Sequence, residues 1–568
     1  MKNYPLYETT VFENFRIMTE NVAKRFPEKT AFSYREHPTD EEAVKVTFSE
    51  VREEVRNYGT ALLELGVRSA KSAIVGGTTI GWIYTYFAVM SIGGVTVPID
   101  KELSAEDISG IIEKAGCKFV FYGSEVGDKI NELKELLSAR DIVWICMNGI
   151  MQNDDSTRRV LTARGGDLFK DGDNGYYDCE IDEDALASIV FTSGTTGKGK
   201  GVMLSQRNIV SDMTQGMYLF QITYKTMCVL PLHHTYGSTV NLVGHFAQGA
   251  EIYISSGLKF FLKEVKEQQP THLILVPLFV ETIYKKIWST AEKTGKAKAL
   301  RKLMKFSNGV KKVGIDMRKL MFKSILDILG GKVTMIICGG AALNQDIIDT
   351  FDAIGITILN GYGITECAPL ISCNRNKLQK SGSVGIPIIG EKVKIDSPDE
   401  NGEGEICVSG PNVMLGYYED PEATEAVFDE EGYFHTGDYG RLDEDGWIYI
   451  TGRLKNLIIF SNGKNVYPEE IENKIQGIYG VSEVVVYAGK SRRDESREVI
   501  VAEIFPDFEA LELRGITGPQ AYFTGEVALI NKTMPSYKVV GLVKIRTTEF
   551  QKNTSKKITR FSIDKTID

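Results

Sequence analysis

Short apolar runs alternate with amphipathic segments along the first half of the chain. Apolar residues recur at helical spacing between Val51 and Leu65, and this pattern predicts a helix that Ser49 caps and Gly66 ends. Further helices are predicted at about 80–92 and 126–137, between runs of strand length at 73–75, 95–98, 118–122 and 141–146. Strands that alternate with helices predict a parallel α/β layer, whereas the polar stretch 153–180 is expected to form a loop or a surface excursion.

In the second half of the chain the pattern of predicted helices and strands changes. A second α/β alternation runs from the apolar segment 272–276 to the segment 333–338. From about 384 to 452, short strands separated by Gly, Asp and Asn turns predict a β subdomain packed against the α/β layers. The last hundred or so residues, which combine a helix starting near Tyr467 with strands at 484–487 and 499–504, are expected to form a small α+β unit.

Composition narrows the class of protein. The 568 residues include 43% hydrophobic and 25% charged residues, the mean hydropathy is −0.13, and the chain therefore belongs with soluble globular proteins. A net charge of −10 argues against general nucleic-acid binding. The eight cysteines form no C-x-x-C pair, a pattern that indicates a reduced, intracellular protein. Cys338 and Cys367, which flank motifs described below, are interpreted as small core residues. Because no run of about eighteen uncharged apolar residues occurs, we expect a cytoplasmic protein that is at most peripheral to a membrane.

A loop rich in glycine and hydroxyl residues follows the predicted strand 187–191. It consists of Thr192, Ser193, Gly194, Thr195, Thr196 and Gly197, and Lys198 and Lys200 come directly after it. Such a loop can turn several N–H and O–H donors toward one anion, and lysines can neutralise outer phosphates. Residues 194–200 also spell the G-x-x-x-x-G-K of a Walker loop, but Gly201 stands where that motif needs Ser or Thr. The following residues 202–204 also look like a strand, whereas a Walker loop opens a helix.

Later segments carry side chains suited to the rest of a nucleotide. Gly340 and Ala341 follow a predicted strand, where a backbone without bulky side chains can lie flat against a planar base. A second glycine-rich turn contains Asn360, Gly361, Tyr362, Gly363, Thr365 and Glu366. In it, the Tyr362 ring offers a face for adenine, Thr365 offers a donor to phosphate, and Glu366 offers a carboxylate ligand for Mg²⁺. The carboxylate of Asp438 is suited to accept hydrogen bonds from both ribose hydroxyls.

These motifs together resemble those of the acyl-adenylate-forming enzymes, the superfamily of acyl-CoA synthetases, luciferases and peptide-synthetase adenylation domains. Residues 192–201 match that family's T-S-G-T-T-G-x-x-K-G, and residues 204–208 match the segment that follows it. Gly199 stands where the family most often has Pro. Five motifs occur in the family's order across most of the chain, which is harder to obtain by chance than any single motif.

The resemblance implies roles for several further residues. His234 matches the histidine that lies beside the carboxylate of the acid substrate, and His233 is left without a role. Asp438 matches the family's ribose-binding aspartate, Arg453 would bind ribose or phosphate, and Lys455 would be the hinge. Asn456 replaces the Asp most often found after the hinge. In the last motif Lys557 aligns with the adenylation lysine, although Lys556 stands where the family has Gly and leaves the register between the two lysines open.

The resemblance also implies a domain organisation and a reaction. We expect an α/β fold with a large N-terminal domain, 1–454, that binds acid and ATP, and a small mobile α+β lid domain, 455–568. The implied reaction joins a carboxylic acid to ATP with Mg²⁺, releases pyrophosphate, and then transfers the acyl group from AMP to CoA. An enzyme that passes the acyl group to a carrier protein, a P-loop NTPase, and an inactive binding protein of this fold remain alternatives.

A basic stretch between Lys285 and Lys323 is the most unusual part of the composition. It contains thirteen basic residues and only two acidic ones, Glu292 and Asp316, interleaved with apolar residues. The stretch is either a solvated helical pair or a face that docks on an anionic membrane or a fatty acid. Residues 276–287 and the long helical segment after them resemble long-chain acyl-CoA synthetases, which favours a long-chain fatty acid over an aryl or medium-chain acid.

Overall fold

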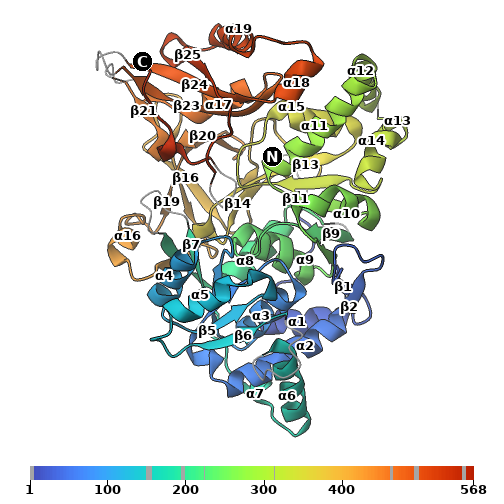
Figure 1. The fold of residues 1–568 in the computed structure, drawn as a ribbon, viewed down its shortest axis with the longest axis vertical. Helices are drawn as coiled ribbons and strands as arrows, with labels where there is room; N and C mark the ends of the chain where they lie inside the picture. Colours follow the sequence, from blue (N-terminus) through green and yellow to red (C-terminus); the bar gives the residue numbers. More distant parts are fainter. Residues whose placement is uncertain are drawn as a thin grey trace.

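The computed structural model shows a mixed α/β protein with several sheets (Figure 1). It describes residues 5–148, 157–192, 199–222, 224–312, 314–460, 465–491, 498–552 and 558–567. The predicted fold class is confirmed, with large α/β layers and a smaller α+β unit near the C-terminus, drawn in orange and red at the top of Figure 1.

A seven-stranded sheet carries the glycine-rich loop. Its order is β18-β8-β7-β4-β3-β5-β6, and β3 to β7 run parallel while β8 and β18 are antiparallel additions. The strands span Lys71–Val75 (β3), Val95–Ile99 (β4), Cys117–Tyr122 (β5), Val143–Cys146 (β6), Leu186–Thr192 (β7), Lys200–Ser205 (β8) and Gly416–Tyr417 (β18). Helices cover the sheet, namely α2 (Phe48–Glu64), α3 (Ile80–Ser91), α4 (Ala105–Ala115) and α5 (Lys129–Leu136). The α/β alternation predicted for this half is therefore confirmed.

Two details of this region differ from the prediction. Helix α2 is capped by Thr47 rather than Ser49, because Thr47 and Glu50 form a reciprocal capping box. The stretch 153–180, expected to be a loop or a surface excursion, contains α6 (Arg158–Lys170) and α7 (Gly175–Asp178). The Gly165–Gly166 pair weakens the helical signal but permits close packing, since a Cβ at Gly165 would lie 1.8 Å from the backbone oxygen of Asn57 in α2.

Two further sheets and a β subdomain complete the part of the chain before residue 455. One sheet has the order β2 (Val44–Thr47), β1 (Thr30–Tyr34), β10 (Glu251–Ile254) and β9 (Lys225–Cys228). The second has the order β11 (His272–Leu275), β12 (Met335–Cys338), β13 (Thr357–Gly363), β14 (Leu370–Cys373) and β15 (Ile386–Pro387). The antiparallel sheet β16 (Lys392–Asp396), β17 (Gly404–Ser409), β19 (Phe434–Leu442) and β20 (Ile448–Arg453) lies where the β subdomain was predicted.

The C-terminal part has its own sheet and its own hydrophobic core. Strands β23 (Val481–Lys490), β24 (Glu498–Pro506) and β25 (Val540–Ile545) pair in that order, and they are accompanied by helices α17 (Pro468–Gln476), α18 (Phe508–Leu513) and α19 (Pro519–Asn531). Ile471, Ile475, Val486, Ile504 and Phe523 form the centre of the core. The domain boundary at 454/455 and the mobility of the C-terminal part remain predictions.

Helices between β11 and β12 contain the basic stretch. They are α11 (Pro277–Lys293), α12 (Ala297–Lys312), α13 (Arg318–Met321) and α14 (Lys323–Leu326). Among the described residues, no helix is both long and apolar enough to span a membrane.

Candidate active site

The β7–β8 hairpin places both ends of the glycine-rich loop. Thr192 ends β7 and pairs in register with Lys200, the first residue of β8, and the Thr192 hydroxyl donates to the Lys200 carbonyl at 3.4 Å. The remaining loop positions, Ser193, Gly194, Thr195, Thr196, Gly197 and Lys198, lie outside the described residues. Residues 202–204 form a strand, as predicted. A Walker loop is followed by a helix, so this segment is not a Walker loop.

Tyr417 connects this hairpin to Glu366. Because β18 pairs with β8, the Tyr417 ring lies under Lys200, with Nζ 4.4 Å from the ring centroid. The Tyr417 hydroxyl donates to Glu366 Oε1 at 3.0 Å, and burial followed by the charge of Glu366 raises the pKa of Tyr417. Lys200 therefore contacts the ring face of Tyr417 and Glu366 contacts its hydroxyl, so one aromatic side chain that sequence analysis had not singled out joins the two.

Tyr362, Asp438 and Arg453 form a second connected group. The Tyr362 hydroxyl donates to Asp438 Oδ2 at 2.8 Å, and Arg453 Nε lies 2.8 Å from Asp438 Oδ1. Asp438 and Arg453 are register partners on β19 and β20, whereas Tyr362 comes from β13 of another sheet. Burial followed by the charge of Asp438 raises the pKa of Tyr362, which keeps its hydroxyl protonated as the donor.

The other small residues of the candidate nucleotide site lie at strand ends. Gly340 and Ala341 follow β12, and Gly340 has a φ of +88°, a conformation that favours glycine. Asn360, Gly361 and Gly363 belong to β13. Thr365 and Glu366 lie in a 3₁₀ turn after β13, and both are partly exposed.

His233 and His234 precede an eight-residue π-helical segment, Tyr236–Val243. Their rings lie 4.3 Å apart, and the backbone N–H groups of Gly237 and Ser238 both donate to the His234 carbonyl at 2.9 Å. His233 Nε2 lies 3.5 Å from Asp100 Oδ2, and burial lowers the pKa of His233 despite this carboxylate. His233 therefore has a charged neighbour, although the sequence suggested no role for it.

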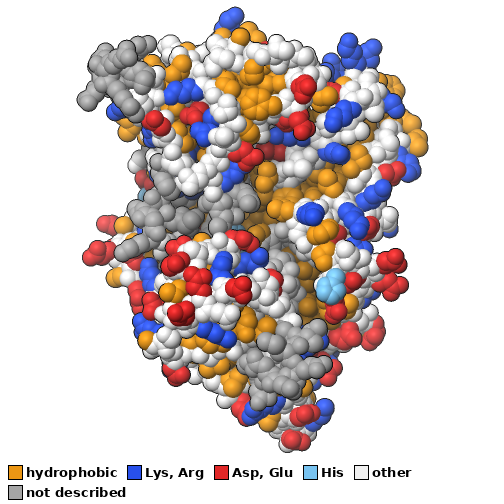
Figure 2. All heavy atoms as spheres, viewed as in Figure 1, with side chains coloured by type: hydrophobic (Ala, Val, Ile, Leu, Met, Phe, Trp, Pro, Cys, Tyr) orange, Lys and Arg blue, Asp and Glu red, His pale blue; other side chains and the backbone are white. Residues whose placement is uncertain are grey.

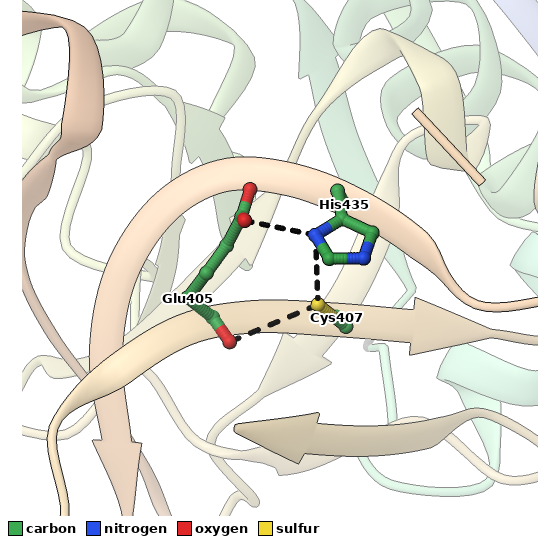
Figure 3. A group of neighbouring side chains, drawn as sticks. All are labelled: Glu405, Cys407 and His435. Carbon is green, nitrogen blue, oxygen red and sulfur yellow. Dashed lines mark hydrogen bonds and ion pairs between the residues drawn. The ribbon is translucent and has the colours of Figure 1, made fainter. Parts of the chain in front are cut away.

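Glu405, Cys407 and His435 support the segment that carries Asp438 (Figure 3). His435 Nδ1 lies 2.8 Å from Glu405 Oε2 and 3.5 Å from Cys407 Sγ. Because the carboxylate and the thiol share one ring nitrogen, the group lacks the relay geometry of a nucleophilic triad, and burial raises the pKa of Cys407 to about 12. Glu405 Oε1 accepts from the N–H of Gly437 at 2.9 Å, which fixes the turn before Asp438.

A cleft of about 400 Å³ adjoins these residues and is lined in part by Glu366, Tyr417, His435 and Thr436. Thr436 accepts a hydrogen bond from the N–H of Asp438 at 3.1 Å. The cleft therefore lies between the candidate Mg²⁺ ligand and the turn that positions Asp438. Neither Thr436 nor His435 was singled out, because the contacts that place them join strands distant in sequence.

The predicted hinge lies in a short 3₁₀ turn, Leu454–Asn456, after β20. Burial, and next the neighbouring Arg453, lower the pKa of Lys455. Asn456 donates to Glu469 Oε1 at 2.5 Å, so the residue that departs from the family pattern contacts the start of α17. Lys556 and Lys557 lie outside the described residues.

Glu292 of α11 contacts residues of the C-terminal part. Glu292 Oε2 accepts from the Tyr479 hydroxyl at 2.9 Å, and Glu292 Oε1 lies 2.7 Å from Arg514 Nη2. One acidic side chain of α11 thereby contacts two residues of the C-terminal part.

The sequence of this chain is similar to those of known proteins. The family model described as AMP-binding enzyme matches residues 19–418. A long-chain-fatty-acid–CoA ligase of Mycobacterium bovis is 27% identical over 488 residues, covering 82% of this chain and 78% of that protein. The long-chain-fatty-acid–CoA ligase 5 of Rattus norvegicus is 29% identical over 497 residues, covering 82% and 71%.

Solved structures share the fold over almost the whole chain. The anthranilate CoA ligase AuaEII in complex with anthranoyl-AMP superposes with a TM-score of 0.76 at 19% identity, covering 99% of this chain and 98% of that one. ATP-bound MatB from Rhodopseudomonas palustris superposes with a TM-score of 0.74 at 21% identity, covering 97% and 98%.

Proposed function

Because the chain belongs to the AMP-binding enzyme family, we propose that it is an AMP-forming acid–CoA ligase whose acid is a long-chain fatty acid. The observation that carries the proposal is one cleft, lined by Glu366 and Tyr417 on one side and by the turn 435–437 before Asp438 on the other. Tyr417 joins Glu366 to Lys200 at the end of the glycine-rich loop, and Tyr362 holds Asp438. Relatives named as long-chain-fatty-acid–CoA ligases support the choice of acid.

In the proposed first half-reaction, the acid's carboxylate attacks the α-phosphate of ATP, and pyrophosphate leaves. The bond between the α- and β-phosphates breaks as the acyl–phosphate bond forms, so the protein must orient two anions and offset their charge. Lys200 and the loop 192–197 would bind the outer phosphates, Asp438 and Arg453 the ribose, and Gly340, Ala341 and residues 360–363 the adenine. Thr365 would donate to phosphate, and His234 would lie beside the acid.

Glu366 fits the role of the Mg²⁺ ligand. Its carboxylate lines the cleft, and Tyr417 orients one of its oxygens. A hard carboxylate oxygen in this position suits Mg²⁺, which would neutralise phosphate charge when bound. In the proposed second half-reaction the CoA thiol sulfur attacks the acyl carbon and AMP leaves, and the C-terminal part would rotate about Lys455 so that Lys557, the proposed adenylation lysine, withdraws.

The first half-reaction can be tested by exchange of labelled pyrophosphate into ATP. We expect exchange that requires both Mg²⁺ and a fatty acid, and that Glu366→Gln reduces at least 100-fold while the protein stays folded by circular dichroism. Exchange without any acid, or ADP formation instead, would contradict the proposal. Comparing palmitate, octanoate and an aryl acid in the same assay ranks the three candidate acid classes.

We further propose that the face formed by α12 and α13 contacts anionic membranes. Leu320 is 73% exposed and Phe306 is 62% exposed. Helix α12 also carries exposed lysines, among them Lys298, Lys302, Lys305 and Lys312. Figure 2 shows Lys and Arg side chains around hydrophobic atoms at the upper right, over these helices. Exposed apolar side chains surrounded by lysine are suited to an anionic interface.

Liposome sedimentation tests this contact. Each lysine near an anionic surface contributes about 1 kcal/mol, so replacing Lys298, Lys302 and Lys305 with Ser should weaken binding to phosphatidylglycerol vesicles roughly 100-fold at low salt. Three exposed lysines elsewhere serve as a matched control, namely Lys118, Lys377 and Lys532. Equal loss in both variants, or binding that is indifferent to salt and lipid charge, would refute the contact.

A further inference from the structure

Five buried oxygen atoms, from four polar side chains, have no hydrogen-bond donor in the described part of the chain. These atoms are Asp212 Oδ2, Gln215 Oε1, Glu391 Oε1, Glu391 Oε2 and Asn412 Oδ1. Asp212 and Gln215 lie on α8 (Gln206–Met217), Glu391 precedes β16, and Asn412 lies between β17 and β18. Buried acceptors are normally paired, so a group of them requires an explanation.

The four side chains are neighbours in space. Asn412 Nδ2 lies 3.4 Å from Asp212 Oδ1. A Cβ at Gly410 would lie 2.0 Å from Glu391 Oε2 and 2.9 Å from Asn412 Oδ1, so these two oxygens flank one point that a larger residue would fill. A Cβ at Gly390 would lie 3.0 Å from Gln215 Nε2, which places Gln215 beside the residue before Glu391.

Two carboxyl groups in this position are costly for the fold. Asp212 is 0% exposed and Glu391 is 8% exposed. Among the described residues, no Lys or Arg pairs with either of them. Burial raises the pKa of both carboxyl groups, that of Glu391 to about 8. An uncompensated buried carboxylate is unfavourable unless a proton or a cation neutralises it.

We propose that Asp212, Gln215, Glu391 and Asn412 form a buried binding site for a hard metal cation, with Ca²⁺ the ion that matches it best. The donor set consists only of oxygen atoms, two carboxyl groups and two amides, which disfavours soft metals. A divalent ion balances both carboxylate charges, whereas K⁺ or Na⁺ leaves one. Ca²⁺ accepts irregular oxygen sets, while Mg²⁺ requires octahedral geometry and retains several waters.

The site is distinct from the Mg²⁺ position proposed at Glu366, but it supports the same turn. Asn412 Nδ2 donates to the carbonyls of Cys367 at 3.0 Å and Leu370 at 2.9 Å. Asp212 Oδ1 accepts from the N–H of Leu370 at 2.7 Å, and the N–H of Met414 donates to the Glu366 carbonyl at 2.8 Å. A bound cation would therefore stiffen the segment that holds Glu366. This inference does not depend on the proposed ligase activity.

Calcium binding by the intact protein tests the inference without ATP, acid or turnover. After treatment with chelator and buffer exchange, equilibrium dialysis with ⁴⁵Ca²⁺ at constant ionic strength should give one site per chain. Ca²⁺ should also raise the melting temperature, and Mg²⁺, K⁺ and Na⁺ should raise it less. The variant Glu366→Gln should retain the site, which separates it from the nucleotide-associated Mg²⁺ position.

The variant Glu391→Gln gives the sharpest contrast. It should weaken Ca²⁺ binding at least tenfold, yet melt no lower than wild type in chelator, because Gln has nearly the same size as Glu391 and never carries a buried charge there. Glu400→Gln, an exposed change on the same segment, should behave as wild type. The proposal would be overturned if wild type bound no Ca²⁺, or if Glu391→Gln bound it as tightly as wild type. It would also be overturned if lowering the pH raised the melting temperature while Ca²⁺ did not, or if K⁺ or Mg²⁺ raised it and Ca²⁺ did not. The wild-type titration decides the question even if the variant fails to fold.

Discussion

Replacing Asp438 with Asn tests the proposed ribose contact directly. Asp438 is 2% exposed and receives Tyr362 and Arg453 at 2.8 Å each. An Asn has the same shape and can still accept from Arg453 while it donates to the Tyr362 oxygen, so the fold should persist. The change removes a negative charge from the group proposed to accept both ribose hydroxyls.

The expected loss follows from the number of bonds affected. A hydrogen bond to a charged group contributes about 1.5–3 kcal/mol and a neutral one about 0.5–1.5 kcal/mol. Weakening two ribose bonds by about 1 kcal/mol each gives roughly 2 kcal/mol, or about 30-fold in the dissociation constant of ATP. Tyr362→Phe removes only a group that orients Asp438, and we expect a loss of about fivefold.

Calorimetric titration with ATP and with 2′,3′-dideoxy-ATP, in the absence of acid, provides the assay. Wild type should bind ATP more tightly than the dideoxy analogue, and Asp438→Asn should remove most of that difference. Equal weakening toward both nucleotides would place Asp438 away from the ribose and refute the reasoning, as would unchanged ATP affinity in a folded variant.

Two further predictions concern the rest of the molecule. The buried His245–His272 pair, with Nε2 atoms 2.8 Å apart, should make folding sensitive to acid: burial lowers the folded pKa of His245 to about 4, so its contribution is retained above about pH 6.5 and lost as pH falls toward 4. The free energy of unfolding should fall by about 2 kcal/mol more between pH 7 and pH 5 in wild type than in His245→Asn, measured by urea unfolding, and an equal fall in both would contradict this assignment. Glu292→Gln should loosen the C-terminal part by about 1 kcal/mol or less, and so speed protease cleavage at Lys455 a few-fold relative to the exposed control Glu512→Gln; an unchanged rate would show that the Glu292 contacts do not hold the two parts together.

Local pattern was sufficient to predict the elements that carry the site. The apolar run 187–191 ends in the glycine-rich loop, and the structure places β7 and the return strand β8 there. The alternation of strands and helices in the first 150 residues also predicted a parallel layer, and β3 to β6 run parallel. The helix α6 escaped detection because Gly165 and Gly166 lower helical propensity, and their value lies in packing against Asn57 that only the tertiary structure shows.

Contacts between distant segments could not be predicted from spacing. Tyr417 lies between Lys200 and Glu366 because β18 joins the edge of β8, a pairing across more than 200 residues. The Glu405–His435 contact and the buried group around Glu391 arise in the same way, from strands and loops that meet only after folding. The motifs therefore predicted the chemistry of single residues, whereas the residues that contact them could be identified only in the structure.

Product analysis after incubation with ATP, Mg²⁺, CoA and palmitate tests the central claim most directly. The account predicts stoichiometric AMP, pyrophosphate and palmitoyl-CoA, with no thioester when CoA is omitted. AMP and pyrophosphate without a CoA thioester would indicate transfer to a carrier protein, and formation of ADP, or no turnover with any acid, would contradict the assignment as an acid–CoA ligase.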